Sequence, residues 1–290
     1  MSIGFIGLGG MGAAIAGNLV RKSLDLVVWN RSPGAADALV ADGARRAASP
    51  AEAFASDVVF SMLADDKVVE EVIVRSGAID RAGRGTVHVN MATVSVEAAK
   101  SLAAEHARRG LGYVAAPVLG RPDAAAAGGL AVLMAGPDDA KAKVRPILEL
   151  ASRAVFDLGD APFKANVVKI ACNFSLASMI ETLGEAGALA KANGVEPAQL
   201  FEIMTATLFA APAYRVYAPL IAERRFEPAG FKLPLGLKDV RLALAAGEAM
   251  NAALPIASLL RDNFLAAIAH GDGEKDWSAL AGEAFRRAGL

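Results

Sequence analysis

Three glycines near the N-terminus constrain the fold of this chain more than any other feature. Gly7, Gly9 and Gly12 lie in the stretch GFIGLGGMGAAIAGNL, between a short apolar run at residues 3–7 and an alanine-rich segment at residues 11–22. In a G-x-G-x-x-G motif the first glycine permits a tight turn, the second lets a pyrophosphate approach the backbone, and the third allows close helix packing. A chance match in an Ala/Gly-rich stretch is the alternative. Because an apolar strand precedes the motif and a helix and second strand (residues 24–29) follow, the sequence indicates a dinucleotide-binding loop formed by Gly7, Leu8, Gly9, Gly10, Met11 and Gly12.

The alternation of strands and helices continues through the first half of the chain. Apolar runs typical of buried strands lie at residues 57–63, 86–91, 112–116 and 131–135, and helical segments lie at residues 49–55, 67–74, 96–109 and 140–151. Strands that alternate with helices favour a mainly parallel sheet with helices on both faces. The predicted fold class is therefore α/β, with a doubly wound Rossmann domain over residues 1–160.

The second half of the chain has a different pattern of predicted elements. A long helix is predicted over residues 161–193, followed by helices at residues 197–208, 213–224, 235–249 and 256–269, without an alternating strand. The sequence predicts an all-helical domain over residues 161–290, joined to the first domain by the long helix.

Composition excludes several classes of function. Thirty basic and 31 acidic residues give a formal net charge of -1, which offers no overall attraction to nucleic acid or an anionic membrane. Cys172 is the only cysteine, and His88, His106 and His270 are scattered, so no metal site is expected and the histidines are interpreted as structural or solvated.

No secretory signal is apparent, and charge or glycine interrupts every apolar run before the roughly 20 residues of a membrane span. We expect a cytoplasmic protein with a small-molecule substrate, and the apolar faces of the helical half suggest a homodimer or homotetramer.

The end of the second strand indicates which dinucleotide is bound. An NAD site usually places Asp or Glu there for the ribose hydroxyls, whereas this chain has Asn30, Arg31 and Ser32. A guanidinium and a hydroxyl beside an uncharged amide can receive a 2′-phosphate, which a carboxylate would repel. NADP(H) is favoured over NAD(H). The alternative is that Arg31 is a solvated turn residue.

Lys169 and Asn173 stand four residues apart on the long helix and so share one face. Burial lowers the pKa of a lysine, and a positioned ammonium can protonate the oxygen of a carbonyl that receives a hydride while an amide fixes the geometry. The alternative is an ordinary surface lysine whose stem lies along apolar neighbours.

Five segments in order resemble the β-hydroxyacid dehydrogenase family. They are the glycine-rich stretch, WNRS at the second strand end, APVLG, KIACN on the long helix, and GLKDVRLAL in the helical half. The resemblance covers essentially the whole chain. It implies two domains with the active site in the cleft between them, and reversible NAD(P)-dependent oxidation of a β-hydroxyacid to its semialdehyde or keto form.

The resemblance also implies roles for single residues. Lys169 and Asn173 match the catalytic lysine and asparagine, and both are expected to contact the substrate. Leu63 and Ala64 stand where the family contacts the cofactor, and Thr93 matches a threonine at the nicotinamide end. Lys238 matches a lysine that closes over cofactor and substrate, although a charged surface pair with Asp239 is the alternative.

The segments expected to hold the substrate depart from the family pattern. Asn90 and Ala92 stand in a segment that usually reads Asp-x-Ser-Thr, and Leu119, Gly120 and Arg121 replace a usual Ser-Gly-Gly. Leu119 offers no side-chain donor to an anion. Either Arg121 supplies a replacement donor, or the substrate is bulkier and less polar than a short hydroxyacid.

Two other functions remain open from the sequence. Phe163 and Ala165 replace the glycines usual before the catalytic lysine, which narrows the space near it. An imine reductase shares this architecture but usually carries Asp or Tyr at the position of Lys169, and a noncatalytic NADP(H)-binding protein would have lost that lysine. The sequence therefore favours an NADPH-dependent reductase with Lys169 as general acid or base.

Overall fold

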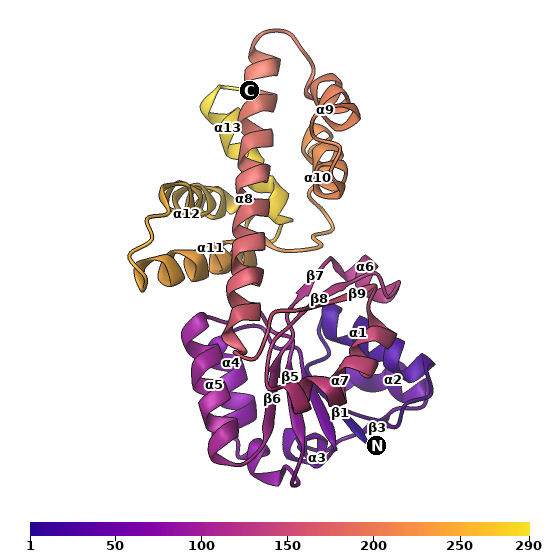
Figure 1. Cartoon of the computed structure of the whole chain (residues 1–290). Coiled ribbons are helices and arrows are strands. Elements are labelled where there is room, and N and C mark those ends of the chain that lie inside the picture. Colours follow the sequence, from indigo (N-terminus) through magenta and orange to yellow (C-terminus); the bar gives the residue numbers. More distant parts are fainter. The chain divides into compact units, whose positions relative to one another are not determined.

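The computed structural model describes all 290 residues, which form two compact units (Figure 1). Unit 1 comprises Met1–Lys169 and unit 2 comprises Ile170–Leu290. The chain divides inside helix α8 (Phe163–Ala192), so the end of unit 1 lies within the long helix, later in the chain than residue 160, where the sequence places the boundary.

A six-stranded parallel sheet forms the centre of unit 1, in the strand order β3-β2-β1-β4-β5-β6. Side chains alternate between its two faces: Ile3 and Phe5 join one apolar cluster, whereas Ile6 joins the other. Both faces are buried, which explains why these strands read as continuous apolar runs. The strands are β1 (Ile3–Ile6), β2 (Leu26–Trp29), β3 (Arg45–Arg46), β4 (Val58–Ser61), β5 (Val87–Asn90) and β6 (Gly112–Ala115).

Helices cover both faces of this sheet, which confirms the predicted doubly wound fold. They are α1 (Gly10–Arg21), α2 (Asp37–Ala41), α3 (Pro50–Phe54), α4 (Asp66–Val69), α5 (Val96–Arg108) and α7 (Asp138–Ala151), with the short helices η1 (Pro33–Ala36), η2 (Glu70–Arg75) and η3 (Ala78–Arg81).

A second, three-stranded sheet carries the strand predicted at residues 131–135. In this sheet β7 (Val118–Leu119) runs antiparallel to β8 (Ala131–Met134), and β9 (Ala154–Asp157) runs parallel to β8. An isolated bridge between Ala115 and Ala135 links it to the end of β6. Helix α6 (Pro122–Ala126) lies between β7 and β8 in the sequence. The prediction missed β3, β7 and β9, because two have only two residues and β9 is half exposed.

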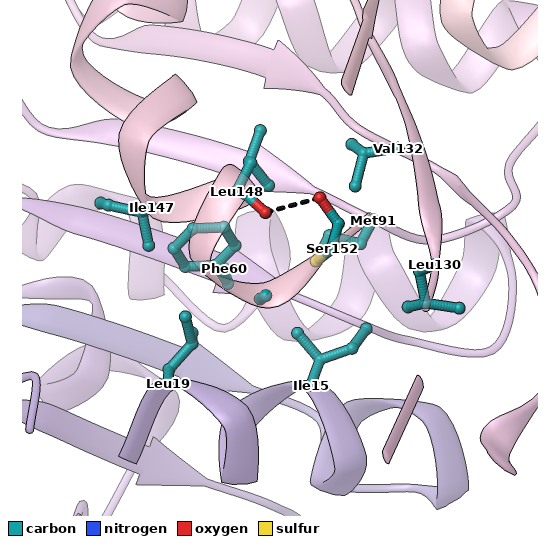
Figure 2. A pocket seen from close by; sticks show the side chains of 10 residues that line it. Ile15, Leu19, Phe60, Met91, Leu130, Val132, Ile147, Leu148 and Ser152 are labelled. Carbon is teal, nitrogen blue, oxygen red and sulfur yellow. Dashed lines mark hydrogen bonds between the residues drawn. The ribbon is translucent and has the colours of Figure 1, made fainter. Parts of the chain in front are cut away.

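An internal cavity lies in the core of unit 1, as Figure 2 shows. Its volume is about 10 Å³, and its lining is apolar except for Ser152, whose hydroxyl donates to the Leu148 carbonyl at 2.7 Å. A void of this size holds one water at most, and an apolar lining gives that water few partners. The cavity is a packing void and not a ligand site. Its other lining residues include Ile15, Leu19, Phe60, Met91, Leu130 and Val132.

Unit 2 is entirely helical, as predicted. Helix α8 packs closely on two later segments through glycines: a Cβ at Gly184 would lie 2.7 Å from the Ala281 Cα, and one at Gly187 would lie 2.9 Å from the Phe285 ring. The remaining helices are α9 (Pro197–Ala206), α10 (Pro212–Ala222), α11 (Leu233–Glu248), α12 (Pro255–Ala267), η4 (Ile268–Asp272), η5 (Trp277–Ala281) and α13 (Gly282–Arg287).

Helix α8 is the one helix whose length and composition would allow it to cross a membrane. Half of its most apolar window is buried inside the protein. The core helix of a soluble protein passes the same test, so α8 is weak evidence for a membrane span.

A buried carboxyl group lies in the core of unit 2. Glu181 on α8 accepts a hydrogen bond at 2.6 Å from the Asn263 amide on α12, and its other oxygen has no partner. Burial, with a smaller contribution from Glu185, raises the pKa of Glu181 to about 7. The native state therefore holds a proton that the unfolded chain releases above its ordinary pKa of 4.5.

We predict that Glu181→Gln stabilises the protein above pH 7 and has little effect near pH 4.5. A folded-state pKa raised above the unfolded value gives stability that is present at low pH and is lost as pH rises through 4.5 to 7. The expected gain is on the order of 1–3 kcal/mol, measured by denaturant unfolding at both pH values. Exposed Glu185→Gln is the matched control, with a smaller expected gain; a Glu181→Gln effect equal at both pH values would contradict the prediction.

Candidate functional site

The glycine loop has the geometry that dinucleotide binding requires. Gly7 has a φ of +94°, and a Cβ there would lie 2.4 Å from the Met62 carbonyl oxygen. A Cβ at Gly12 would lie 2.0 Å from the Gly7 carbonyl oxygen, whereas one at Gly9 would meet no atom within 4 Å. Gly9 is the N-cap of α1, whose first turn carries no acidic side chain. The loop thus leaves open space at a helix N-terminus, where a diphosphate is stabilised.

Asn30 connects this loop to the end of β2. Its Oδ1 accepts a hydrogen bond from the Leu8 N–H at 2.9 Å, and its Nδ2 donates to the Ser32 carbonyl at 3.1 Å. Asn30 therefore shapes the site through its amide. Arg31 and Ser32 are exposed, and their side chains make no hydrogen bond or ion pair within the protein. They remain available to a ligand.

The loops after β4 and β5 lie at the same edge of the sheet as the glycine loop. A Cβ at Gly7 would lie 3.0 Å from a methyl group of Leu63, which places Leu63 against the loop. Asp66 accepts a hydrogen bond from the Ser95 N–H at 2.9 Å, which ties the loop containing Ala64 to the loop containing Thr93. Carboxyl ends of parallel strands are the usual place for a ligand.

The segment predicted to hold the substrate also lies near the glycine loop. A Cβ at Gly10 would lie 4.0 Å from Pro122, and the Asn18 amide of α1 donates to the Ala125 carbonyl of α6 at 2.7 Å. Gly120 has a φ of +141°, and Arg121 is the half-buried N-cap of α6 whose side chain does not cap the helix. Leu119, Gly120 and Arg121 thus lead directly into a helix packed on α1.

Leu119 does not present a polar group at this point. Its side chain is half-buried and packs against the apolar cluster on one face of the unit 1 sheet. Ala92, on the preceding loop, is fully buried, and its N–H donates to Asn90 Oδ1 at 3.1 Å. Neither residue supplies the side-chain hydroxyl that the usual family pattern would provide.

Helix α8 carries the predicted catalytic pair on one face. Lys169 is 8% exposed and Asn173 is 5% exposed, which disagrees with the alternative of a surface lysine. The Asn173 Nδ2 donates to an oxygen of Asp239 on α11. A carboxylate only accepts hydrogen bonds, so this contact fixes the orientation of the Asn173 amide.

Two residues beside this pair escaped the sequence prediction. Asp239 is 2% exposed, and the Lys238 ammonium lies 3.3 Å from its Oδ1, so the alternative of a surface charge pair is wrong. The sequence feature that could have identified Asp239 is its position on α11, where it shares a helical stripe with the buried residues Gly236, Val240 and Ala243. Asn166 lies one turn before Lys169 on α8; its side chain is 1% exposed, and its Oδ1 has no partner. No sequence pattern distinguishes such an amide.

Two histidines that are distant in sequence form one buried chain of hydrogen bonds below the β5 loop. The His106 Nδ1 lies 2.7 Å from the Leu102 carbonyl, the two imidazoles are joined at 2.9 Å, and His88 Nε2 lies 2.8 Å from the Ser61 hydroxyl. Since a carbonyl only accepts, His106 must donate from Nδ1, His88 must donate to His106, and Ser61 must donate to His88. Burial lowers the pKa of His88 well below its usual value and lowers that of His106 to about 4.

Two family profiles match the chain. The profile described as the NAD binding domain of 6-phosphogluconate dehydrogenase matches residues 2–159. The profile described as NAD-binding of NADP-dependent 3-hydroxyisobutyrate dehydrogenase matches residues 164–283.

Similar proteins cover nearly the full length of the chain. An uncharacterized oxidoreductase, YfjR, of Bacillus subtilis is 44% identical over 97% of this chain and 98% of its own length. The chloroplastic glyoxylate/succinic semialdehyde reductase 2 of Arabidopsis thaliana is 32% identical over 99% of this chain and 80% of its own. A solved structure of 3-hydroxyisobutyrate dehydrogenase from Mycobacterium tuberculosis with L-serine has a TM-score of 0.88, with 30% identity over 97% of this chain and 98% of that one.

We predict that Gly9→Ala and Gly12→Ala fail in different ways. A Cβ at Gly9 meets no protein atom, so the variant should keep its stability but lose NAD(P)H affinity by about tenfold or more, because the methyl group occupies the open space. A Cβ at Gly12 would overlap the Gly7 carbonyl, so that variant should be destabilised. Fluorescence titration and thermal unfolding test both, and unchanged binding by Gly9→Ala would contradict the assignment of the loop.

We predict that the buried histidine pair makes unit 1 sensitive to acid. A folded-state pKa below the unfolded value of 6.5 gives stability that is present above pH 6.5 and is lost as pH falls toward 4, by up to about 1.4 kcal/mol per pH unit for each histidine. His106→Leu should flatten this pH dependence in denaturant unfolding. His270→Asn is the control, because its side chain is 53% exposed; an equal flattening by both variants would exclude the explanation.

Proposed function

Since the chain belongs to the β-hydroxyacid dehydrogenase family, and so is an NAD(P)-dependent oxidoreductase that acts on hydroxyacids, we propose that it works as an NADPH-dependent reductase of a small aldehyde or keto acid. The reaction would be reversible. The observation that carries the proposal is the buried pair of Lys169 and Asn173 on one face of α8, with the Asn173 amide oriented by Asp239.

The proposed cofactor fits the polar groups of unit 1. The open space at Gly9 and the first turn of α1 would receive the diphosphate, and Arg31 and Ser32 would receive the 2′-phosphate. Leu63, Ala64 and Thr93 would line the nicotinamide end, as the resemblance implies. The nicotinamide, when bound, supplies or accepts the hydride.

In the proposed mechanism the residues of the chain transfer the proton. Lys169 would donate a proton to the carbonyl oxygen of the substrate as negative charge develops there, and would accept it back in the oxidative direction. The Asn173 amide would form a hydrogen bond with the substrate, as donor or acceptor. Its orientation is fixed because Asp239 accepts a hydrogen bond from it. Lys238, which contacts Asp239, would supply a second positive charge toward an acidic substrate.

Of the two alternatives for the β7 loop, a replacement donor or a bulkier and less polar substrate, we propose the first. Ala92 and Leu119 provide no hydroxyl, so Arg121 would be the side chain that binds a substrate carboxylate. The similarity to a glyoxylate/succinic semialdehyde reductase supports a small aldehyde that carries a carboxylate. A panel of semialdehydes and keto acids, assayed with both nicotinamide cofactors, would identify it.

The two alternatives differ from this proposal at Lys169. An imine reductase usually carries Asp or Tyr at this position, and a noncatalytic NADP(H)-binding protein would not need a buried ammonium beside an oriented amide. The lysine and its burial support the hydroxyacid reductase. Turnover of a cyclic imine in preference to every carbonyl in the panel would favour the imine reductase instead.

We also propose that the chain is a homo-oligomer assembled through unit 2. Several large apolar side chains of this unit are exposed in the single chain, and an interface with a second copy would cover them. Light scattering after size exclusion measures the oligomeric state. The cytoplasmic location of the protein also stays a prediction. The exposed side chains include Leu189, Ile203, Leu208, Met250 and Ile256.

We predict that Lys169→Ala lowers kcat by about 10²- to 10⁴-fold, because the proton transfer loses its donor. The Kd for NADPH should change less than about twofold, since the loop that binds the diphosphate is intact. Lys164→Ala is the matched control: Lys164 lies on the same helix, is half exposed and pairs with Asp160 at 3.5 Å. Equal activity of Lys169→Ala and Lys164→Ala would overturn the catalytic assignment.

A further inference from the structure

The turn after β2 is held from two sides, and we propose that Arg46 on β3 is a positioning residue that sets selectivity for NADPH over NADH. The inference rests on the proposed function, in which Arg31 and Ser32 receive the 2′-phosphate. It adds a residue from another strand, which neither the glycine motif nor the end of β2 identifies.

Asn30 holds the inner side of the turn. Its amide donates to the Ser32 carbonyl at 3.1 Å, and the Ala35 N–H donates to the same carbonyl at 3.2 Å. The Asn30 oxygen is in turn fixed by the Leu8 N–H of the glycine loop. The turn therefore keeps a defined position relative to the loop that would hold the diphosphate.

Arg46 holds the outer side of the same turn. It is the last residue of β3 and pairs with Val28 of β2 in the sheet. Its Nη1 donates to the Pro33 carbonyl at 3.0 Å, and its Nη2 pairs with Asp37 at the start of α2. One guanidinium thus links the strand, the turn and the following helix, which a lysine with a single ammonium does not do in the same planar geometry.

These contacts engage the carbonyls of the turn and leave donors on its exposed side chains. The carbonyls of Ser32 and Pro33 are both engaged by protein N–H groups, whereas the side chains of Arg31 and Ser32 have no partner within the protein. A phosphate group carries acceptor oxygens and about 1.5 to 2 negative charges. The Arg46 contact engages the Pro33 carbonyl, whose partial negative charge would otherwise disfavour a phosphate near it, and holds a guanidinium at the turn that carries Arg31 and Ser32.

The ion pair between Arg46 and Asp37 contributes little to folding. Their side chains are 40% and 68% exposed, and pairs this exposed have small effects on stability. Loss of Arg46 should therefore be visible in cofactor affinity before it is visible in thermal unfolding.

Arg45 provides a matched control on the same strand. It precedes Arg46 directly, is exposed, and pairs with Asp25 at 3.4 Å, away from the turn. Removing either arginine changes the net charge by the same amount. A difference between the two variants therefore reports the contact with the turn and not the overall charge.

The experiment measures Kd for NADPH and NADH by fluorescence titration of the full chain. Arg46→Ala should weaken NADPH binding about three- to tenfold, the range of one hydrogen bond, and leave NADH binding within about twofold. Arg46→Lys should be intermediate, and Arg45→Ala should bind both cofactors like the unmodified protein. An equal loss in Arg45→Ala, an equal loss for both cofactors, or no loss in Arg46→Ala would overturn the inference.

Arg31→Ala separates this inference from the proposed function. If Arg31→Ala weakens NADPH binding and Arg46→Ala does not, the 2′-phosphate site stands and only the role of Arg46 is wrong. If Arg31→Ala leaves NADPH affinity unchanged, the proposed cofactor preference itself fails. Thermal unfolding of each variant confirms that a change in affinity occurs in a folded protein.

Discussion

The close approach of α1 to the end of β1 is the constraint on which the rest of unit 1 depends. The α-carbon of Gly12 lies so near the Gly7 carbonyl that any side chain there would overlap it. This contact sets the direction of α1, so that its N-terminus points toward the open space beside Gly9. The same loop presents the Leu8 N–H to Asn30, so the position of the turn after β2 follows from it.

Two asparagines of unit 1 and one of unit 2 form hydrogen bonds that fix their side-chain amides. Asn30 and Asn90 each end or follow a strand and use the amide oxygen to accept from a loop N–H, while the amide nitrogen donates elsewhere. Asn173 donates to Asp239. A carboxylate at these positions could not donate. The Asn30 amide therefore links the glycine loop to the turn after β2, and the Asn90 amide links the start of the β5 loop to Tyr113 on β6, both without adding negative charge where a phosphate or an acidic substrate is expected.

Features encoded in neighbouring residues were predictable from the sequence, and features created by tertiary contact were not. The glycine loop, β1 and α1 depend on a few adjacent positions, and the structure confirms their type and order. The pairing of His88 with His106 requires β5 and α5 to pack together, so their separation in sequence suggested isolated residues. From the sequence alone, Asp239 could be one member of a surface charge pair with Lys238. The packing of α11 instead places Asp239 in a buried stripe of the helix.

The two ends of the ligand-binding edge of unit 1 offer different groups to a ligand. At the β2 end an amide, Asn30, stands where an NAD site usually has a carboxylate, and the exposed side chains of Arg31 and Ser32 support the proposed 2′-phosphate site. At the β5 and β7 ends expected hydroxyls are replaced by Ala92 and Leu119, and the structure packs both into apolar surroundings. With neither hydroxyl present, the guanidinium of Arg121 would be the side-chain donor for a substrate carboxylate at this end, as proposed. The divergence therefore lies in the segments proposed to bind the substrate, whereas Lys169 and Asn173 on α8 keep the residue types that the resemblance implies.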